Sequence, residues 1–411
     1  MLHVTKPTLL LSVIIPARTE FPSIVFTIYS IIHCLESDGI DPKQVEIIVV
    51  DNCSTDNHYY PQRATRGTTT YLMPRGMYWS RLLRVLYDPI AGNHSARNKG
   101  ARIARGEYIY FSDAHMSFQP GFFKSMLKTC KETGGLVHGS VQWSGAYPPH
   151  SGGMGYGYTF KLGEEWKMTW NNYKVADTPF AVAGQGHWGV MVNRDQFLSF
   201  GGYPDVHRTY GGGEVFVDCL WWMYGSSVVT DPNAIGYHLS SGRGYTYDHD
   251  DYIHNIFNCG WALGADDWIE RAYLNYMRKG RKEVLDRMMA EAKIEMLDRR
   301  AKIDKFKKMT FNDLLINKPW DQWNQRVHGK TNSSMLVYHW SWLELLDQSP
   351  DYVKEAYRNS QYQRGLQEFI ETNLSDVIYK KDRYTEERKE ELRRLVNGIE
   401  IRNESPEAAR S

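Results

Sequence analysis

Residues 9–16 read Leu-Leu-Leu-Ser-Val-Ile-Ile-Pro, and residues 45–52 read Val-Glu-Ile-Ile-Val-Val-Asp-Asn. The apolar, β-branched character of the two runs predicts buried strands over residues 9–15 and 45–50. Between them, residues 24–35 have the periodicity of a helix, with Ser23 as its N-cap. Apolar strands joined by a helix are typical of a parallel sheet that is covered on both faces. The sequence therefore predicts an α/β fold for roughly the first hundred residues.

Further elements follow along the chain. Residues 95–105 and 215–224 are helix-like, and a strand over 108–111 leads into Asp113. From about residue 273 glycine becomes rare, and charged amphipathic segments follow over 283–308, 341–346, 351–373 and 385–396. We therefore expect an α/β domain over residues 1–275 and an α-helical C-terminal region over residues 276–411. The apolar stripes of these helices would pack on the first domain or on a second copy in a homo-oligomer.

The composition excludes several classes of protein. The chain has 411 residues, of which 42% are hydrophobic, with 34 Gly and 16 Pro, and this excludes a disordered or fibrous protein. The longest apolar run ends at Pro16, so no transmembrane helix is predicted, and the run is interpreted as a strand rather than a signal peptide. Five dispersed cysteines without a Cys-x-x-Cys pair favour a reducing, cytoplasmic location.

The net charge of +1 hides an alternation along the chain. Residues 61–105 hold nine basic residues and one acidic residue, and residues 271–310 hold 13 basic and six acidic residues. Residues 106–270 hold nine basic and 17 acidic residues. Arginines interleaved with aromatic residues in the first basic block suit a phosphate backbone and stacked bases. The alternative is that the basic residues neutralise the acidic block or lie on solvated helix faces.

Asp113-Ala-His115 places two metal-binding side chains at the end of a predicted strand. Residues two apart in an extended backbone point to the same side. An Asp oxygen and a His nitrogen suit Mn²⁺ or a similar divalent ion, and ligands of open α/β sheets bind beyond the strand ends. The alternative is that Asp113 caps a turn and His115 is a surface residue.

A glycine triplet, Gly211 to Gly213, is followed by Glu214. This pattern fits a tight loop that presents one carboxylate to a cleft. The alternative is a plain glycine turn in which Glu214 occupies the first turn of a helix, where the helix dipole favours an acid. No Gly-Lys-Ser/Thr follows, so a P-loop is not supported.

Motifs over residues 11–273 follow one another in the order of a known family. The chain resembles the GT-A-fold glycosyltransferases, and most of all the catalytic domain of the polypeptide N-acetylgalactosaminyltransferases. Asp113-Ala-His115 has the family's Asp-x-His form, where most GT-A relatives carry Asp-x-Asp. The other matching segments are Ser12 to Pro16 with Glu20, Ile47 to Asp56, Ala96 to Gly100, Gly152 to Met154, Ala183-Gly184, Gly201 to Tyr203, Gly212 to Glu214 and Gly236 to His238.

The resemblance implies a fold, a cofactor and a donor. Residues 1–275 would form a GT-A domain, a Rossmann-like nucleotide-diphospho-sugar transferase fold, followed by the helical region. Asp113, His115 and His238 would hold Mn²⁺ or Mg²⁺, which would neutralise the diphosphate of a nucleotide-sugar, favoured as a UDP-sugar. The enzyme would then be a hexosyl- or N-acetylhexosaminyltransferase.

The resemblance also implies roles for other residues. Glu214 would bind donor sugar hydroxyls or orient the acceptor, and Arg243 would stabilise the leaving phosphate. A segment over residues 240–254 would close over the donor as a lid. The residues that we expect to bind the donor are Pro16, Arg18, Glu20, Asp51, Asn52, Arg97, Asp113 and Gly213.

One departure from the family's wider group bears on stereochemistry. Many inverting GT-A relatives carry Glu-Asp after the glycines, with the Asp as general base, whereas Val215 stands there in this chain. Asp218, one helical turn further on, is a possible but weaker substitute. The sequence therefore favours a retaining mechanism, in which the leaving phosphate accepts the proton of the acceptor.

The acceptor is inferred from the basic blocks. With no membrane anchor, disulfide pattern or lectin domain expected, a Golgi enzyme of protein O-glycosylation is disfavoured. Asn52-Cys-Ser is an N-glycosylation sequon inside the presumed nucleotide site, where a glycan added in a secretory compartment would be damaging. This also disfavours a Golgi enzyme. The favoured acceptor is a 5-hydroxymethylpyrimidine in DNA, and the location is the cytoplasm, or the host cytoplasm if the protein is viral. The alternative is transfer to protein Ser/Thr or polysaccharide hydroxyls.

A hypothesis of another class is a non-catalytic protein that binds nucleotide-sugars or glycans on the same fold. The intact set of Asp113, His115, His238 and Glu214 argues against it, because a protein without activity has no chemical need for these residues.

Overall fold

A computed structural model describes residues 7–21, 23–55, 83–145, 151–161, 167–170, 174–240, 246–277 and 281–330. The strands are β1 (Leu9–Ala17), β2 (Val45–Asn52), β3 (Leu83–Asp88), β4 (Gly106–Ser112), β5 (Met116–Phe118), β6 (Leu136–Gly145), β7 (Ser151–Gly155), β8 (Tyr158–Lys161), β9 (Lys167–Trp170), β10 (Phe180–Ala181), β11 (Gly189–Asn193) and β12 (Val228–Ser240). The helices are α1 (Ser23–Ser37), α3 (Asn93–Ile103), α4 (Phe122–Thr133), α5 (Arg194–Phe200), α6 (Gly213–Met223), α7 (His249–Leu263), α8 (Asp266–Met277), α9 (Lys282–Glu295), α10 (Leu297–Phe306), α11 (Phe311–Asn317) and α12 (Pro319–His328).

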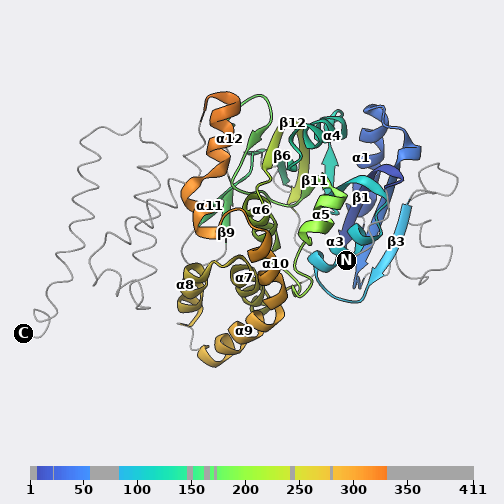
Figure 1. Ribbon diagram of the computed structural model, residues 1–411. Helices are drawn as coiled ribbons and strands as arrows, with labels where there is room; N and C mark the ends of the chain where they lie inside the picture. Colours follow the sequence, from blue (N-terminus) through green and yellow to red (C-terminus); the bar gives the residue numbers. More distant parts are fainter. Residues whose placement is uncertain are drawn as a thin grey trace, which may run out of the picture. The chain divides into compact units, whose positions relative to one another are not determined.

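One mixed sheet forms the centre of the fold (Figure 1). Its strands run in the order β10-β12-β6-β11-β4-β1-β2-β3, with β5 paired to β12 and β7 to β6. The strands β3, β2, β1 and β4 are parallel, and β11 is antiparallel to both β4 and β6. The predicted parallel sheet is therefore confirmed for the N-terminal part, and the later strands make the whole sheet mixed.

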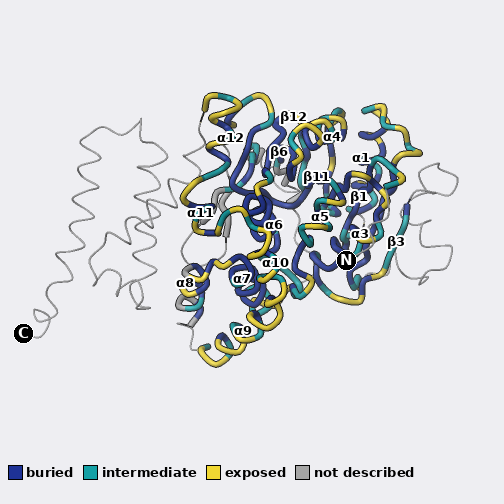
Figure 2. The backbone as a smooth tube through the Cα atoms, in the orientation of Figure 1, coloured by how far each residue is buried: buried dark blue, intermediate teal, exposed yellow. Residues whose placement is uncertain are grey.

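Helices cover both faces of the parallel strands (Figure 2). On one face, Val13 and Val49 share a buried core with Ile28 of α1. On the other face, Gly100 of α3 lies so close to Ile14 that a Cβ on the glycine would be 2.5 Å from the Ile14 side chain. Because both faces are covered, the apolar runs of β1 and β2 are continuous rather than alternating.

Glu46 interrupts the apolar run of β2 and is nevertheless fully buried. Ser12 Oγ donates a hydrogen bond to its carboxylate at 2.7 Å, and Arg84 and Arg105 lie 3.0 and 3.1 Å from it. Burial alone would raise the pKa of Glu46, but these donors outweigh it and lower the pKa. Two arginines of the first basic block thus satisfy a buried carboxylate.

The helices that follow β12 pack on the rest of the fold. The single helix predicted over 283–308 is interrupted at Met296, between α9 and α10, and both of these helices contact α7. In α12, the Asn324 side chain exchanges two 2.8 Å hydrogen bonds with the backbone of Ala181. The domain boundary after residue 275 stays a prediction, and the helices predicted beyond residue 330 lie outside the described residues.

The described residues also bear on membranes and disulfides. No helix among them combines the length and apolar character needed to cross a bilayer. All five cysteines are free thiols. The cytoplasmic location inferred from the sequence stays a prediction.

Candidate metal and donor site

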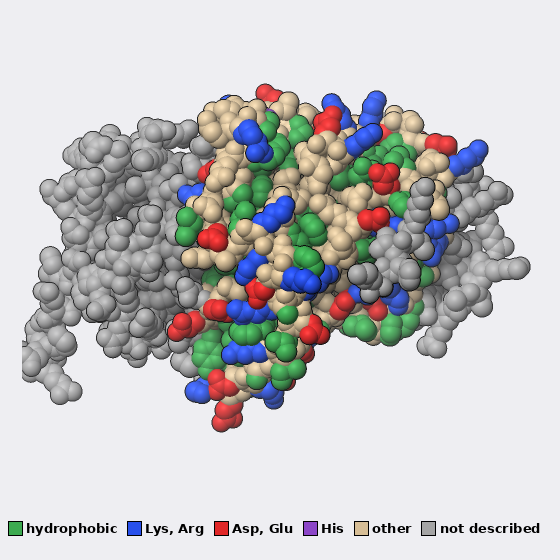
Figure 3. Space-filling model, viewed as in Figure 1, with side chains coloured by type: hydrophobic (Ala, Val, Ile, Leu, Met, Phe, Trp, Pro, Cys, Tyr) green, Lys and Arg blue, Asp and Glu red, His purple; other side chains and the backbone are tan. Residues whose placement is uncertain are grey.

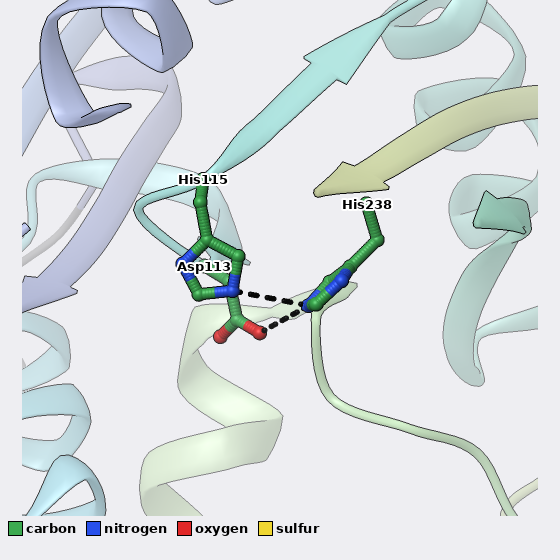
Figure 4. Close-up of side chains that lie close together, drawn as sticks. All are labelled: Asp113, His115 and His238. Carbon is green, nitrogen blue, oxygen red and sulfur yellow. Dashed lines mark hydrogen bonds and ion pairs between the residues drawn. The ribbon is translucent and has the colours of Figure 1, made fainter. Parts of the chain in front are cut away.

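The sheet brings Asp113, His115 and His238 together from two distant parts of the chain (Figure 4). Strands β4 and β12 run in the same direction, because β6 is parallel to β12 and both β4 and β6 are antiparallel to β11. Asp113 follows β4, and His238 lies near the end of β12. The antiparallel pairing of β5 with β12 sets Met116 opposite His238, which brings His115 beside it.

The three side chains converge on one point. His115 Nε2 lies 3.2 Å from His238 Nε2, which lies 3.4 Å from Asp113 Oδ2. One potential ligand atom from each residue lies within 4.8 Å of the others. Neighbouring ligands held about 2.1 Å from an octahedral ion are about 3 Å apart. The predicted metal ligands therefore lie together, with a spacing and donor set that suit Mn²⁺ or Mg²⁺.

Two residues that the sequence assigned to the donor, Glu20 and Arg97, contact the metal ligands. Glu20 Oε2 lies 3.2 Å from His115 Nδ1, so the carboxylate accepts from Nδ1–H and leaves Nε2 as a ligand. Arg97, 1% exposed, donates to Asp113 Oδ1 at 3.0 Å. Burial would raise the pKa of Asp113, but the His238 hydrogen bond and the charge of Arg97 hold it well below its usual range.

Glu214 lies in the first turn of α6, the position that the alternative interpretation of the glycine triplet gave it. Among the described residues, none donates a hydrogen bond to its carboxylate. Burial raises the pKa of Glu214, and the nearby charges of His187 and Arg97 act in the opposite direction. A partly buried carboxylate close to the metal ligands is suited to accept hydrogen bonds from sugar hydroxyls.

The glycines before Glu214 are required by the backbone and by close packing. Gly211 and Gly212 have φ of +100° and +83°, which disfavour other residues. A Cβ on Gly213 would lie 2.4 Å from the ring of His94 at the start of α3. Gly213 was predicted to bind the donor, and the structure additionally shows that it allows α6 to approach α3.

Asp218 lies one turn after Glu214 but is fully buried. Its Oδ2 accepts from the backbone N–H of Gln185 at 2.8 Å, and its Oδ1 lies 3.1 Å from His187 Nε2. Both oxygens therefore already have partners inside the protein. Burial raises the pKa of Asp218.

The predicted nucleotide-binding residues lie at the ends of β1 and β2. Asp51 Oδ1 accepts from the backbone N–H of Ser54 at 3.0 Å. The Asn52 side chain donates to Ile90 O at 2.6 Å and accepts from Gly92 N–H at 2.7 Å, and it thereby fixes the loop before α3. Its contact with a nucleotide stays a prediction. Pro16 and Arg18 are partly buried at the end of β1. Arg243 and residues 241–245 of the predicted lid over 240–254 lie outside the described residues.

Residues 61–82 of the first basic block lie outside the described residues, and the arginines of its described part have partners within the protein. Besides the pairs with Glu46, Arg97 binds Asp113 and Arg102 binds Asp205. In the second block, Arg300 pairs with Asp266. On the face seen in Figure 3, basic and acidic side chains are interspersed. These observations favour the alternative in which the described basic residues neutralise acidic ones.

The structure places two further residues, Tyr158 and His187, near the site, and neither was predicted from the sequence. The Tyr158 hydroxyl lies over Gly186, where a Cβ would be 2.5 Å from it. Burial and the negative charges of Glu214, Asp218 and Asp113 raise the pKa of this tyrosine. His187 lies fully buried next to Asp218. Neither residue belongs to a recognisable motif. Tyr158 is held at the site by the pairing of its backbone with Gly184, and His187 lies in the same 182–189 loop.

Comparisons with known proteins agree with this geometry. Residues 12–149 match the model of the family described as glycosyl transferase family 2. Polypeptide N-acetylgalactosaminyltransferase 3 of Drosophila melanogaster is 25% identical over 255 residues, which cover 54% of this chain and 37% of that protein. The putative polypeptide N-acetylgalactosaminyltransferase 13 of the same organism is 21% identical over 192 residues, 43% of this chain and 34% of that protein. The matches thus span about a third of the length of these relatives.

A solved structure shares the fold. The crystal structure of GalNAc-T7 with UDP, GalNAc and Mn²⁺ superposes with a TM-score of 0.53 and 14% identity, over 82% of this chain and 57% of that chain. The predicted GT-A fold with helices after the last strand is confirmed. The comparisons give no support to a DNA acceptor.

Proposed function

We propose that this chain, which carries a family 2 glycosyltransferase domain resembling the polypeptide N-acetylgalactosaminyltransferases, transfers N-acetylgalactosamine from UDP-GalNAc to Ser or Thr hydroxyls of polypeptides. The observation that carries the proposal is the convergence of Asp113, His115 and His238 at the ends of β4 and β12. The names of the two curated relatives and the ligands of GalNAc-T7 support the donor and the acceptor.

The metal site and Glu214 have separate tasks in this proposal. Asp113, His115 and His238 would hold Mn²⁺, which when bound supplies positive charge against the diphosphate that leaves. Glu214 accepts hydrogen bonds from the sugar hydroxyls and so orients the anomeric carbon. Asp51, at the end of β2, binds the nucleoside.

The reaction proceeds with retention of configuration. Val215 occupies the position after Glu214, and both oxygens of Asp218 are engaged in the interior. Neither residue is a suitable base. The acceptor oxygen therefore forms a bond to the anomeric carbon while the bond to the diphosphate breaks, and a diphosphate oxygen takes both the electron pair and, in turn, the hydroxyl proton. An α-linked product from UDP-α-GalNAc supports this step, and a β-linked product by NMR overturns it.

A parallel assay on peptide and DNA tests the acceptor. The full chain is incubated with UDP-GalNAc and Mn²⁺, together with a Ser/Thr-rich peptide pool in one arm and hydroxymethylated duplex DNA in the other. Mass spectrometry should find one added N-acetylhexosamine on peptides, and none on nucleosides of the digested DNA. Sugar on the modified base and none on peptide would reverse this assignment.

A matched pair of variants tests the site itself. His238→Ala removes a proposed ligand and should abolish transfer. His328→Ala removes an imidazole at the end of α12, which contacts Pro179 O, and should leave transfer unchanged. Equal activity of His238→Ala and the wild type would contradict the proposed site.

A further inference from the structure

A buried polar network lies directly behind Asp113, and the proposed reaction does not use it. We call it the His187 network, and it consists of Arg97, His187, Tyr203 and Asp218. Each of these side chains is at most 1% exposed. Burying a charged side chain costs free energy unless the charge is paired and hydrogen-bonded. The burial of Arg97 and Asp218 therefore suggests that both have a role here.

The hydrogen bonds of the network have a single consistent direction. A carboxylate only accepts, so His187 Nε2–H donates to Asp218 Oδ1 at 3.1 Å. His187 Nδ1 then accepts from the Tyr203 hydroxyl at 2.6 Å. The second oxygen of Asp218 accepts from the backbone N–H of Gln185 at 2.8 Å. Asp218 therefore holds the 185–188 loop at two points.

The 185–188 loop contacts Asp113 in two ways, directly through the backbone of Trp188 and indirectly through the side chain of Arg97. The Asp113 N–H donates to Trp188 O at 2.8 Å. Arg97 Nη2 donates both to His187 O at 2.6 Å and to Asp113 Oδ1 at 3.0 Å. Arg97 occupies Oδ1, so Oδ2 is the oxygen of Asp113 that is turned to His238.

We propose that Asp218, His187 and Arg97 are positioning residues that fix the Asp113 carboxylate so that it offers one oxygen to the metal. Asp218, selected from the sequence as a substitute general base, anchors the assembly and does not exchange a proton with the acceptor. The inference rests on the metal site of the proposed function and adds the residues that orient one of its ligands.

Calorimetric titration of Mn²⁺ into the full chain, without donor, tests this role. Asp218→Asn keeps the size of the side chain but replaces one of two required acceptors with an NH₂ group. Arg97→Lys keeps the charge but has a shorter side chain, and it replaces the planar Nη2 group that donates to both His187 O and Asp113 with a tetrahedral ammonium group. Both variants should weaken Mn²⁺ binding about 10-fold or more, the usual effect of removing outer-shell partners.

Asp231 offers a matched control for the loss of a buried carboxylate. It is fully buried in β12 and accepts 2.7 Å hydrogen bonds from Ser125 and Thr129 of α4. Both Asp231→Asn and Asp218→Asn should lower thermal stability, but Asp231→Asn should keep the wild-type Mn²⁺ affinity. Arg97→Lys provides the same test if Asp218→Asn fails to fold.

The outcomes separate the two proposals. Wild-type Mn²⁺ affinity in both Arg97→Lys and Asp218→Asn, with transfer to peptide intact in the wild type, overturns the positioning role and leaves the proposed function standing. Equal weakening in Asp231→Asn also overturns it, since the effect would then be a general loss of stability. No Mn²⁺ binding by the wild type overturns both. The pH dependence of kcat distinguishes the two roles of Asp218. If its acid limb is the same in Asp218→Asn as in the wild type, Asp218 positions the loop and does not transfer a proton.

Discussion

Glu20 is the residue expected to act most directly on a ligand of the proposed metal site, because its carboxylate hydrogen-bonds to His115. The carboxylate fixes which imidazole nitrogen carries the proton, and it raises the basicity of the other nitrogen. Glu20→Ala should therefore weaken Mn²⁺ binding about 10- to 100-fold in a calorimetric titration. Glu132→Ala, which removes an exposed carboxylate on α4, should have no effect. Unchanged affinity in Glu20→Ala would show that His115 is not oriented in this way.

Glu214 is expected to act on the substrate and not on the metal. Glu214→Gln keeps the shape but removes the charge, and one charge-assisted hydrogen bond contributes about 1.5–3 kcal/mol. The variant should thus lose about 10- to 100-fold in kcat/KM and keep its Mn²⁺ affinity. Steady-state kinetics and calorimetry on the same sample measure both quantities. A loss of Mn²⁺ affinity would instead place Glu214 among the ligands.

The sequence predicted which side chains lie together where their chemistry is rare, but it could not predict which side chains are buried and already have partners. Asp113, His115 and His238 lie together because the strand order brings the ends of β4 and β12 to one edge. Asp218 was chosen for its spacing along a helix, but spacing carries no information about burial. The partners that occupy its oxygens come from a loop more than 30 residues away.

At the scale of elements, the contact between α3 and α6 sets the position of Glu214. Gly213 begins α6 against the His94 ring, which is itself held by a 2.9 Å hydrogen bond to His207 and stacked on Tyr203. Because this ring has no room to shift, Gly213→Ala should lower the free energy of unfolding by about 1–3 kcal/mol in urea denaturation.

A double-mutant cycle checks the cause of that loss. His94→Ala removes the ring that the new methyl group would strike, so the double variant should be more stable than the sum of the two single effects predicts. Additive effects would show that the two helices do not meet as described.

The bounds of some helices and strands could be predicted from the sequence, but the pairing of the short strand β5 could not. The strands β1 and β2 and the helices α1 and α6 were expected within two residues of their observed bounds. Burial on both faces gives the two strands a continuous apolar run, and α1 shows the periodicity of a helix. The register of the three-residue strand β5 against β12 was not predicted, although it places His115. A short strand carries little pattern, and its pairing depends on residues more than 100 positions away.

At the scale of the whole molecule, a buried histidine makes the fold sensitive to acid. Burial lowers the pKa of His138 to about 3, so this ring stays neutral in the native state. The unfolded chain binds a proton below about pH 6.5, and stability therefore falls as the pH drops from 6.5 toward 3. At pH 5 His138 alone should account for about 2 kcal/mol of lost stability.

His138→Phe tests this pH dependence. Urea unfolding at pH 7 and pH 5 should show that the variant loses about 2 kcal/mol less than the wild type over this interval. An equal loss in both proteins would show that His138 is not buried in its neutral form.

The charge blocks illustrate what the sequence could not reveal about the whole molecule. Counting along the chain gave basic blocks on either side of an acidic one, and a nucleic-acid partner was inferred from them. In the fold, Arg84 and Arg105 bind the buried Glu46, and Arg300 pairs with Asp266 of the acidic block. Segments of opposite charge meet in three dimensions, so a block of charge in sequence is not a patch on the surface.

Dependence of nucleotide binding on the metal ligands is the most direct test of the central claim. UDP is titrated calorimetrically into the wild type with Mn²⁺, into the wild type with the metal chelated, and into Asp113→Asn with Mn²⁺. We expect UDP to bind in the first titration and at least about 10-fold more weakly in the other two, since a bound divalent ion contributes several kcal/mol of charge stabilisation at a phosphate. Equal UDP affinity in all three would contradict a metal-assisted donor site at Asp113, His115 and His238.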